Sequence, residues 1–469
     1  MGGSKSIKYV LNIIPPLGLA YLAAVLEKNG FEVKIIDCTI EISFKEISKT
    51  IVYEKPHIIG ITSTTASFES AKFVVKRIKE FLPRIIIVIG GAHVSAMPYE
   101  TMESNYFDIG VLGEGEETFL ELVQHIARDG ISDLGAIKGL IFKENGKFAI
   151  TPKREFIKNL DGIPYPARHL LPPLSRYKPT PASYRRLPLG IMITSRGCPH
   201  QCTFCDRAVF GNIYRQRSTD NVLNETEELI HKYGAKEIRF FDDCFTLDKD
   251  RAYKICEGFK ERRLKVPWTC LTTVSSITKD LLKEMKSAGC WQVLFGLESA
   301  DKGMLTLLRK GNTLEQNINA VTWAKQAGLS VRADFIVGTP GETEESLKKT
   351  LGFAMRMKLD YAHFNKFVPY PGTELYRSLI GEGYNFAFGK GCSITDNTAF
   401  LYTPLTLNKS YYMNFINYAH KKFYLRPEYI LKRLFSIRSW NELQGQIRGF
   451  LSIALLKKKE LYKPNLSEL

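Results

Sequence analysis

The chain has 469 residues, of which 44% are hydrophobic and 24% charged, and its formal net charge at pH 7 is +16. A chain of this length typically forms two or three domains, and the composition excludes a disordered or fibrous protein. No apolar run approaches the roughly 18 residues that a membrane-spanning helix needs. Residues 1–8 do not resemble a secretion signal, so we expect a cytoplasmic protein, and its positive charge makes an anionic partner worth considering.

Short apolar runs alternate with amphipathic stretches in the first quarter of the chain, which predicts a doubly wound α/β domain with a parallel sheet. The segment 7–14 is a poor candidate for the strand that should precede the first helix, so this strand is expected to be missing or displaced. The predicted strands are 33–37, 58–62 and 85–90, and the predicted helices are 16–29 and 67–81.

Residues 151–188 hold eight of the 21 prolines, which predicts a linker that packs by wrapping around its neighbours. Six apolar runs separated by helical stretches follow it. They predict an open barrel of six parallel strands with the active site at their C-terminal ends, because too little chain remains before Gly383 for eight units. The predicted barrel strands are 190–194, 237–241, 268–273, 292–297, 331–337 and 363–368.

The strongest chemical signal is the sequence Cys198-Pro-His-Gln-Cys202-Thr-Phe-Cys205, directly after the first predicted barrel strand. Nine cysteines with a single tight cluster do not suit a disulfide framework. Three thiolates within eight residues predict a metal site, and soft thiolate ligands favour iron-sulfur or zinc. Zinc would need a fourth ligand, which His200 could supply, but no second Cys or His pair has a matching spacing.

This cysteine loop resembles that of the radical S-adenosylmethionine (SAM) superfamily, in spacing, in the aromatic residue before the third cysteine and in its place after the first barrel strand. The resemblance implies that Cys198, Cys202 and Cys205 bind three irons of a 4Fe-4S cluster. It also implies that the fourth iron binds the methionine moiety of SAM, and that one electron splits SAM to give a 5'-deoxyadenosyl radical, which the barrel shields from water. An electron donor such as flavodoxin or ferredoxin is then required.

Polar residues follow several other predicted strands, where the family binds SAM. By resemblance, Asp242 and Asp243 anchor the methionine ammonium, although Asp243 could equally be a helix N-cap. Glu298 would contact the ribose or methionine. The glycines of the fifth strand end would allow the adenosyl group close to the backbone, and the segment after the sixth strand would form the adenine-side edge. These last candidates are Gly338, Gly341 and Tyr370.

The N-terminal domain is similar to the cobalamin-binding domain that precedes the barrel in one branch of these enzymes. Its glycine-rich turns lie at predicted strand ends, where a nucleotide tail would bind. The signature of proteins that ligate cobalt through histidine is absent, so the resemblance implies base-off cobalamin; a scaffold domain without cofactor is the alternative, and His93 could equally be a packing residue. The candidate contacts are Thr62, Ser63, Gly90, Gly91, His93, Gly113, Glu114 and Gly115.

The chain beyond Lys409 has helical apolar faces and carries twelve Lys and Arg against four Asp and Glu. Such a basic helical cap could simply cover the barrel. An apolar stretch, 451–456, followed by three lysines, 457–459, favours peripheral contact with an anionic membrane surface, which would bring the enzyme to a lipid or another apolar substrate. A nucleic-acid partner is not favoured, because no RNA-binding module is recognisable.

The combined expectation is an α/β protein with a Rossmann-like cobalamin domain, a partial (β/α)6 TIM-type barrel and a helical C-terminal cap. The expected function is cobalamin-dependent radical methylation of an unactivated carbon in a small, apolar substrate. Cyclisation or another carbon-skeleton reaction with the same cofactors is the alternative, and a non-catalytic iron-sulfur scaffold is disfavoured because the strand-end carboxylates are present. No catalytic base can be named. The expected segments are 1–150, 151–188, 189–385 and 386–469.

Overall fold

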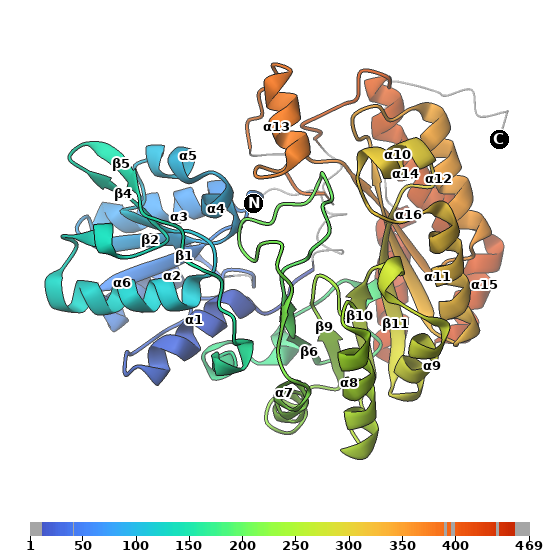
Figure 1. The fold of residues 1–469 in the computed structure, drawn as a ribbon, viewed down its shortest axis with the longest axis horizontal. Helices are drawn as coiled ribbons and strands as arrows, with labels where there is room; N and C mark the ends of the chain where they lie inside the picture. The colour runs from blue at the N-terminus through green and yellow to red at the C-terminus, as the bar shows by residue number, and fades with distance from the viewer. Residues whose placement is uncertain (1–11, 41, 389–391, 395–398, 438–439, 455–469) are drawn as a thin grey trace.

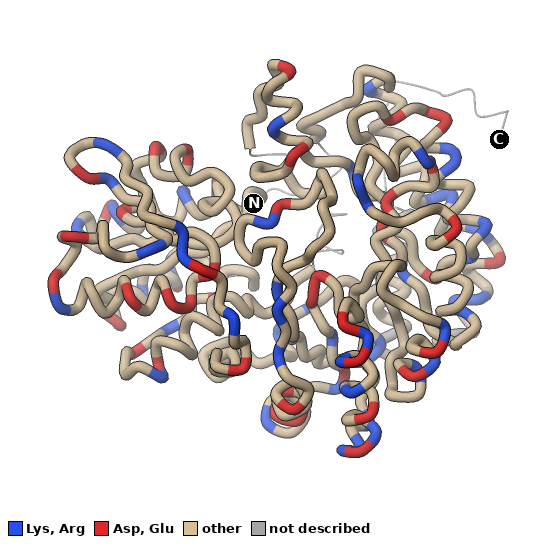
Figure 2. Tube along the Cα trace, in the orientation of Figure 1, with Lys and Arg blue, Asp and Glu red and all other residues tan. Residues whose placement is uncertain are grey.

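The computed structural model describes residues 12–40, 42–388, 392–394, 399–437 and 440–454. In Figure 1 the N-terminal sheet and its helices form the left half, and a six-stranded sheet with its helices forms the right half. Lys and Arg are interspersed with Asp and Glu over both halves (Figure 2). No helix in the described ranges is long and apolar enough to cross a membrane.

The N-terminal sheet has five strands in the order β1-β2-β3-β4-β5. The first three pair in parallel, as the apolar runs predict. The Ile and Val side chains of β2 and β3 are mostly buried, whereas those of the edge strand β1 are half-buried. Its strands are β1 (Ile58–Thr62), β2 (Ile86–Gly90), β3 (Ile109–Val111), β4 (Leu140–Glu144) and β5 (Lys147–Ile150). Its helices are α1 (Leu17–Lys28), α2 (Phe44–Glu54), α3 (Phe68–Phe81), α4 (Ala92–Ala96), α5 (Pro98–Glu103) and α6 (Gly115–Asp129).

Two features of this half differ from the prediction. Residues 33–37 are not a strand: Val33 and Ile35 pack beside α1 and Leu170 without joining the sheet. The sheet is instead extended by the antiparallel hairpin β4–β5, whose turn holds Asn145 and Gly146, both with positive φ. The segment 7–14 lies mostly outside the described residues, and its described part, 12–14, is not a strand.

The proline-rich segment 151–188 forms neither a strand nor a helix longer than one turn. It joins both halves: Tyr177 donates a 2.6 Å hydrogen bond to the buried Asp37 carboxylate of the N-terminal half, and Arg168 Nη2 donates a 3.0 Å hydrogen bond to Ile191 O of the second half. Its 3-10 turns are η3 (Leu160–Gly162), η4 (Arg168–Leu170), η5 (Leu174–Arg176) and η6 (Pro181–Ser183).

The second sheet has the order β13-β12-β11-β10-β9-β6, with every neighbouring pair parallel, which confirms the six-stranded open barrel. Its strands are β6 (Leu189–Met192), β9 (Glu237–Phe240), β10 (Trp268–Thr272), β11 (Cys290–Glu298), β12 (Ser330–Val337) and β13 (Tyr361–Lys366). The intervening helices are α7 (Thr219–His231), α8 (Lys249–Glu261), α9 (Lys279–Ser287), α10 (Lys302–Leu307), α11 (Leu314–Gln326) and α12 (Glu344–Arg356).

Three C-terminal helices complete the barrel's outer layer. Tyr412, Phe415, Ile416 and Phe423 of α14 are buried in the same core as the outward-facing strand side chains, so α14 covers β13 as a crossover helix would. This confirms the predicted helical cap. The remaining elements are the ladder β7 (Ser195–Arg196) and β8 (Arg215–Gln216), the turns η2 (Leu134–Ala136) and η7 (Val274–Ser276), and the helices α13 (Glu374–Gly381), α14 (Lys409–Tyr424), α15 (Pro427–Ser436) and α16 (Trp440–Ala454).

Candidate functional site

The three clustered cysteines lie on a loop between β7 and β8, just beyond the C-terminal end of β6. Gly197 begins the loop with φ +80°, and a side chain there would overlap Ile213 O. Thr203, in the middle of the loop, donates hydrogen bonds from its N–H to Leu308 O and from its hydroxyl to Leu307 O, both at 3.1 Å. These contacts hold the loop against the end of α10.

The three sulfur atoms share one site. The protein atoms packed around the sulfur of Cys205, followed by the charges of Cys202, Asp243 and Cys198, raise the pKa of this thiol to about 12, even though part of the residue reaches solvent. Cys205 is exposed, Cys198 is half-buried and Cys202 is buried. No three His, Cys, Asp or Glu side chains of the described residues converge on a single metal ion. Three thiolates that each bind a different iron of a cluster do not need to converge in this way.

The adjacent carboxylates after β9 have different surroundings. Asp242 is buried and accepts hydrogen bonds from Thr194 N–H at 2.5 Å, Thr194 Oγ1 at 2.5 Å and Ser195 N–H at 3.2 Å, so it holds the segment before the cysteine loop. Asp243 is exposed, and its charge raises the pKa of Cys198 and Cys205. Asp243 is therefore the carboxylate of the two that is available to a ligand beside the cysteines.

Glu298 ends β11 with φ +60°, a left-handed conformation that is uncommon outside glycine. Its Oε1 accepts a 2.8 Å hydrogen bond from Lys310 Nζ; Glu298 is buried and Lys310 is partly buried. Gly296 leaves room for the pair, because a Cβ there would displace the Glu298 carboxylate and the Lys310 ammonium. Burial raises the pKa of the Cys202 thiol and the charge of Lys310 opposes this rise, so the ion pair lies beside the cysteine loop. Sequence reasoning missed Lys310, whose role depends on a contact twelve residues away.

The other predicted SAM contacts are explained by packing within the protein. Gly338 has φ +84°, and a Cβ there would overlap the ring of Tyr412 in α14. Gly341 has φ +77° and faces Met304 at an ordinary contact distance. Tyr370 donates a 2.6 Å hydrogen bond to Cys392 O. Gly338 is therefore needed for Tyr412 whether or not a nucleotide also lies nearby.

The carboxyl ends of β1, β2 and β3 bring the N-terminal candidates to one edge. Gly91 has φ +102°, and a Cβ there would lie 2.8 Å from both Ser63 O and Thr62 Oγ1, so only glycine lets the two turns approach. Gly90 O accepts from Ser63 N–H at 3.1 Å. The Ser63 hydroxyl is buried and has no hydrogen-bond partner among the described residues, which suits a turn that receives a polar ligand.

Three further N-terminal candidates lie close to this edge. His93 is buried, stacks on Phe68 with a centroid distance of 3.9 Å and lies 3.2 Å from Thr65 Oγ1 through Nδ1. Gly113, with φ +77°, lies opposite the carbonyl groups of Ala208 and Val209 in the cysteine loop. Gly115, the first residue of α6, packs on Leu22. The glycine-rich edge of the first sheet thus faces the cysteine loop.

Glu114 has a role between the two halves. Its Oε1 lies 2.9 Å from Arg196 Nη1, and its Oε2 lies 2.7 Å from Arg215 Nη1; Arg196 also binds Glu116 at 2.5 Å. All four side chains are buried, and Arg196 stands two residues before Cys198. The sequence alone could not pair residues eighty or more positions apart, so this network was missed.

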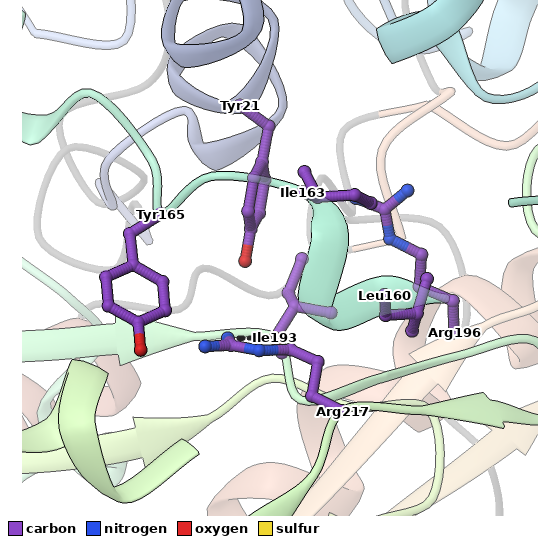
Figure 3. Close-up of a pocket in the computed structure, with 7 residues that line it drawn as sticks. All are labelled: Tyr21, Leu160, Ile163, Tyr165, Ile193, Arg196 and Arg217. Atoms are coloured by element: carbon purple, nitrogen blue, oxygen red, sulfur yellow. Dashed lines mark hydrogen bonds between the residues drawn. The ribbon is translucent and has the colours of Figure 1, made fainter. Parts of the chain in front are cut away.

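A small pocket adjoins the network. Tyr21 of α1 points into it, with the guanidinium of Arg217 beyond the phenol ring (Figure 3). Arg217 forms an ion pair with Glu225, which is fully buried and also binds Arg168. The lining residues come from α1, the proline-rich segment and the chain around β7 and β8, so this region fixes the cysteine loop to the N-terminal helix. They are Tyr21, Leu160, Ile163, Tyr165, Ile193, Arg196 and Arg217.

Comparisons with known proteins agree with this geometry. Residues 192–354 match the model of the radical SAM superfamily, and residues 6–123 match that of the B12 binding domain. An uncharacterized methyltransferase of Pyrococcus horikoshii is 38% identical over 94% of each chain. The chain belongs to the cobalamin-binding branch of the radical SAM superfamily. An anaerobic magnesium-protoporphyrin IX monomethyl ester cyclase of Rubrivivax gelatinosus is also a relative. The two sequences are 30% identical, and the match covers 89% of this radical SAM enzyme and 77% of the cyclase.

The fold has a counterpart among solved structures. The radical SAM methyltransferase TsrM of Kitasatospora setae, solved with cobalamin and a [4Fe-4S] cluster, has a TM-score of 0.64 and 23% identity over 84% of this chain and 77% of its own. The protein is thus a radical SAM enzyme that uses a 4Fe-4S cluster, SAM and cobalamin. The grouped thiols, the free Asp243 and the unpaired Ser63 hydroxyl fit these groups chemically.

Proposed function

We propose that the protein is a cobalamin-dependent radical SAM methyltransferase that methylates an sp3 carbon. The observation that supports this most directly is that Gly113, at the carboxyl edge of the first sheet, faces Ala208 and Val209 of the cysteine loop. A methyl donor held at that edge would lie next to a radical generated at the loop. The bound cofactors would supply a hydrogen-abstracting 5'-deoxyadenosyl radical and a transferable methyl group.

The chain's own residues would hold and shield these groups. Cys198, Cys202 and Cys205 would bind the cluster, and Asp243 would bind the methionine ammonium through a charge-assisted hydrogen bond. The pair of Glu298 and Lys310 would fix the wall beside them, since both charges are buried and satisfied by each other. The half-buried loop and the proline-rich segment would limit the access of water to a radical.

We also propose the residues of the cobalamin edge. Ser63, Gly91 and Gly113 would line it, with Thr62 and Gly90 in the same turns, while Glu114 and Gly115 would act by positioning α6. The buried His93 ring packs on Phe68, so we do not propose it as a cobalt ligand. Base-off binding of cobalamin stays a prediction. An apolar or lipid-like substrate also stays a prediction.

The test is anaerobic reconstitution with iron, sulfide and hydroxocobalamin, followed by assay of SAM products. A methyltransferase should form 5'-deoxyadenosine and S-adenosylhomocysteine in equal amounts once a substrate is present, because one SAM supplies the radical and another supplies the methyl group. The triple variant Cys198→Ala, Cys202→Ala, Cys205→Ala should form neither. If the enzyme never forms S-adenosylhomocysteine in the presence of bound cobalamin, methyl transfer is wrong.

A cyclisation is the second candidate, and the magnesium-protoporphyrin ester cyclase relative favours it specifically. A cyclase would consume one SAM per turnover and leave its methyl group in place. The product ratio of the same assay therefore separates the two: 5'-deoxyadenosine without S-adenosylhomocysteine supports the cyclase.

A further inference from the structure

The inner face of the barrel holds an arginine without a charge partner. Ile238 and Phe240 of β9 pack into the core with the helices, so the alternate residue, Arg239, points to the opposite face of the sheet. Among the described residues its guanidinium has no hydrogen bond and no ion pair. Its contact is the ring of Phe241, the next residue on the same face, 4.9 Å away.

A second arginine lies on the same face of the sheet. Arg332 of β12 alternates with Val331 and Ala333, which pack in the core with the helices, so Arg332 also points to the inner face. Two strands separate β9 from β12, and the charge of Arg332 still acts on Arg239 across them. Arg332 itself is engaged: it donates to Ser183 Oγ at 3.1 Å and to His363 Nδ1 at 2.9 Å, and its Nε lies 3.5 Å from Asp334 Oδ1.

The neighbouring groups are mostly donors. Because arginine has no acceptor, His363 must accept at Nδ1, which leaves a proton on Nε2 for a ligand. Burial and the positive charges around it hold the pKa of His363 well below its usual value, so the ring is neutral. Thr269, the register partner of Arg239 on β10, has a buried hydroxyl without a partner in the described part of the chain.

Two carboxylates lie among these groups. Asp334 lies within 3.5 Å of both Arg332 and His363, and its Oδ1 accepts no hydrogen bond from the described residues. Glu237, two residues before Arg239 on the same strand face, accepts hydrogen bonds from Arg185 N–H, Arg186 N–H and the Trp291 indole. Burial and the charge of Arg332 nevertheless lower the pKa of Arg239 to about 10, against the opposing charges of Asp334 and Glu237. A desolvated arginine beside a second arginine is stabilised by an oxyanion, which its planar fork can bind through two hydrogen bonds.

We propose that Arg239, supported by Thr269 and His363, binds an oxyanion group of the substrate, either a carboxylate or a phosphoryl group. This rests on the proposed function and defines its substrate class. Asp243 follows Arg239 by four residues, just beyond the C-terminal end of β9, so the two lie at most roughly 13 Å apart at about 3.3 Å per residue. The substrate therefore has an acidic end at the base of the barrel and its reacting carbon several bonds away, near the cysteine loop.

The experiment measures oxyanion binding by the cluster-loaded enzyme without turnover. Methylphosphonate and, separately, acetate replace chloride at constant ionic strength, and the thermal unfolding midpoint is recorded, since a ligand of the folded state raises it. The wild type should be stabilised by at least one of the two, and which one distinguishes a phosphoryl from a carboxylate group. Arg239→Gln should weaken that binding about tenfold or more, as expected for loss of a charged hydrogen-bond donor.

The exposed Arg84→Gln, which changes the net charge equally, is the control and should bind as the wild type does. Should Arg239→Gln not fold, Arg239→Lys keeps the charge without the fork and should still bind more weakly than wild type. The inference is wrong if the wild type shows no stabilisation by either anion, or if the Arg239 variant responds as Arg84→Gln does. These outcomes are independent of SAM cleavage, so a failed methyl-transfer assay does not produce them.

Discussion

Asp242 and Asp243 are neighbours in sequence with opposite surroundings, and their substitutions should have different effects. Asp243→Asn should weaken SAM binding about tenfold, because it removes the charge that we propose binds the methionine ammonium, and should leave unfolding unchanged. Asp242→Asn should instead lower the free energy of unfolding by about 1–3 kcal/mol, since it disturbs the buried hydrogen bonds to Thr194 and Ser195. Equilibrium dialysis with SAM and urea denaturation measure the two effects. Equal loss of SAM binding in both variants would contradict the assignment.

Glu237 should make stability depend on pH. It is buried at the start of β9, accepts hydrogen bonds from Arg185 and Arg186 N–H, and burial raises its pKa to about 7. A carboxyl group whose pKa is higher in the folded state stabilises the fold while protonated. That contribution is present below the unfolded value of 4.5 and is lost as the pH rises through about 7.

The expected loss for Glu237 is about 3 kcal/mol between those pH values, and the buried Glu342, whose pKa burial also raises to about 7, adds a similar dependence. Urea denaturation across this range should show that Glu237→Gln flattens the profile by roughly half. The exposed Glu144→Gln should retain the full slope. An unchanged slope in Glu237→Gln would exclude this residue as the source.

At the scale of elements, helix α6 is tied to the cysteine loop by buried charges. Arg196→Met leaves Glu114 and Glu116 buried with one cation fewer, which should lower the free energy of unfolding by about 3–5 kcal/mol. Arg309→Met, which breaks the exposed ion pair with Glu374, is the control and should lower it by at most about 1 kcal/mol. Urea denaturation measures the free energy of unfolding of both variants. Similar losses would show that the buried network stabilises the fold no more than an exposed ion pair does.

Element patterns explain which parts of the fold the sequence predicts. The six barrel strands were predictable, because each is a short apolar run buried on the helix-facing side, such as Val293 and Phe295 in β11. The run 33–37 has the same local pattern but no partner strand, so only tertiary packing distinguishes it. The β4–β5 hairpin had a local signal, Asn145-Gly146, which was overlooked. The contacts of Lys310 and Arg196 come from other segments of the chain and could not be deduced from spacing.

At the scale of the whole molecule, α15 and α16 present exposed apolar side chains, including Phe435 at 88% and Trp440 at 70% exposure. Helices in a basic region with such side chains are expected to bind anionic vesicles. The protein should co-sediment with vesicles rich in phosphatidylserine and not with phosphatidylcholine, and high salt should weaken binding. The stretch 451–459, on which the sequence prediction rested, lies largely outside the described residues.

The variant Phe435→Ser, Trp440→Ser should lose most of this vesicle binding. Tyr53→Ser removes an aromatic side chain that is 83% exposed on α2 and should leave it intact. Binding that both variants retain would assign the interaction to charge alone. If the wild type does not bind the anionic vesicles, the predicted membrane contact is wrong.

The contact of Gly338 with Tyr412 joins the end of β12 to a helix that follows more than seventy residues later. The phenol also donates a 2.8 Å hydrogen bond to Val337 O. The C-terminal helices are therefore not an interchangeable attachment: a chimera that takes them from a relative must bring both the tyrosine and the glycine, or the transplanted helix will not seat against the barrel.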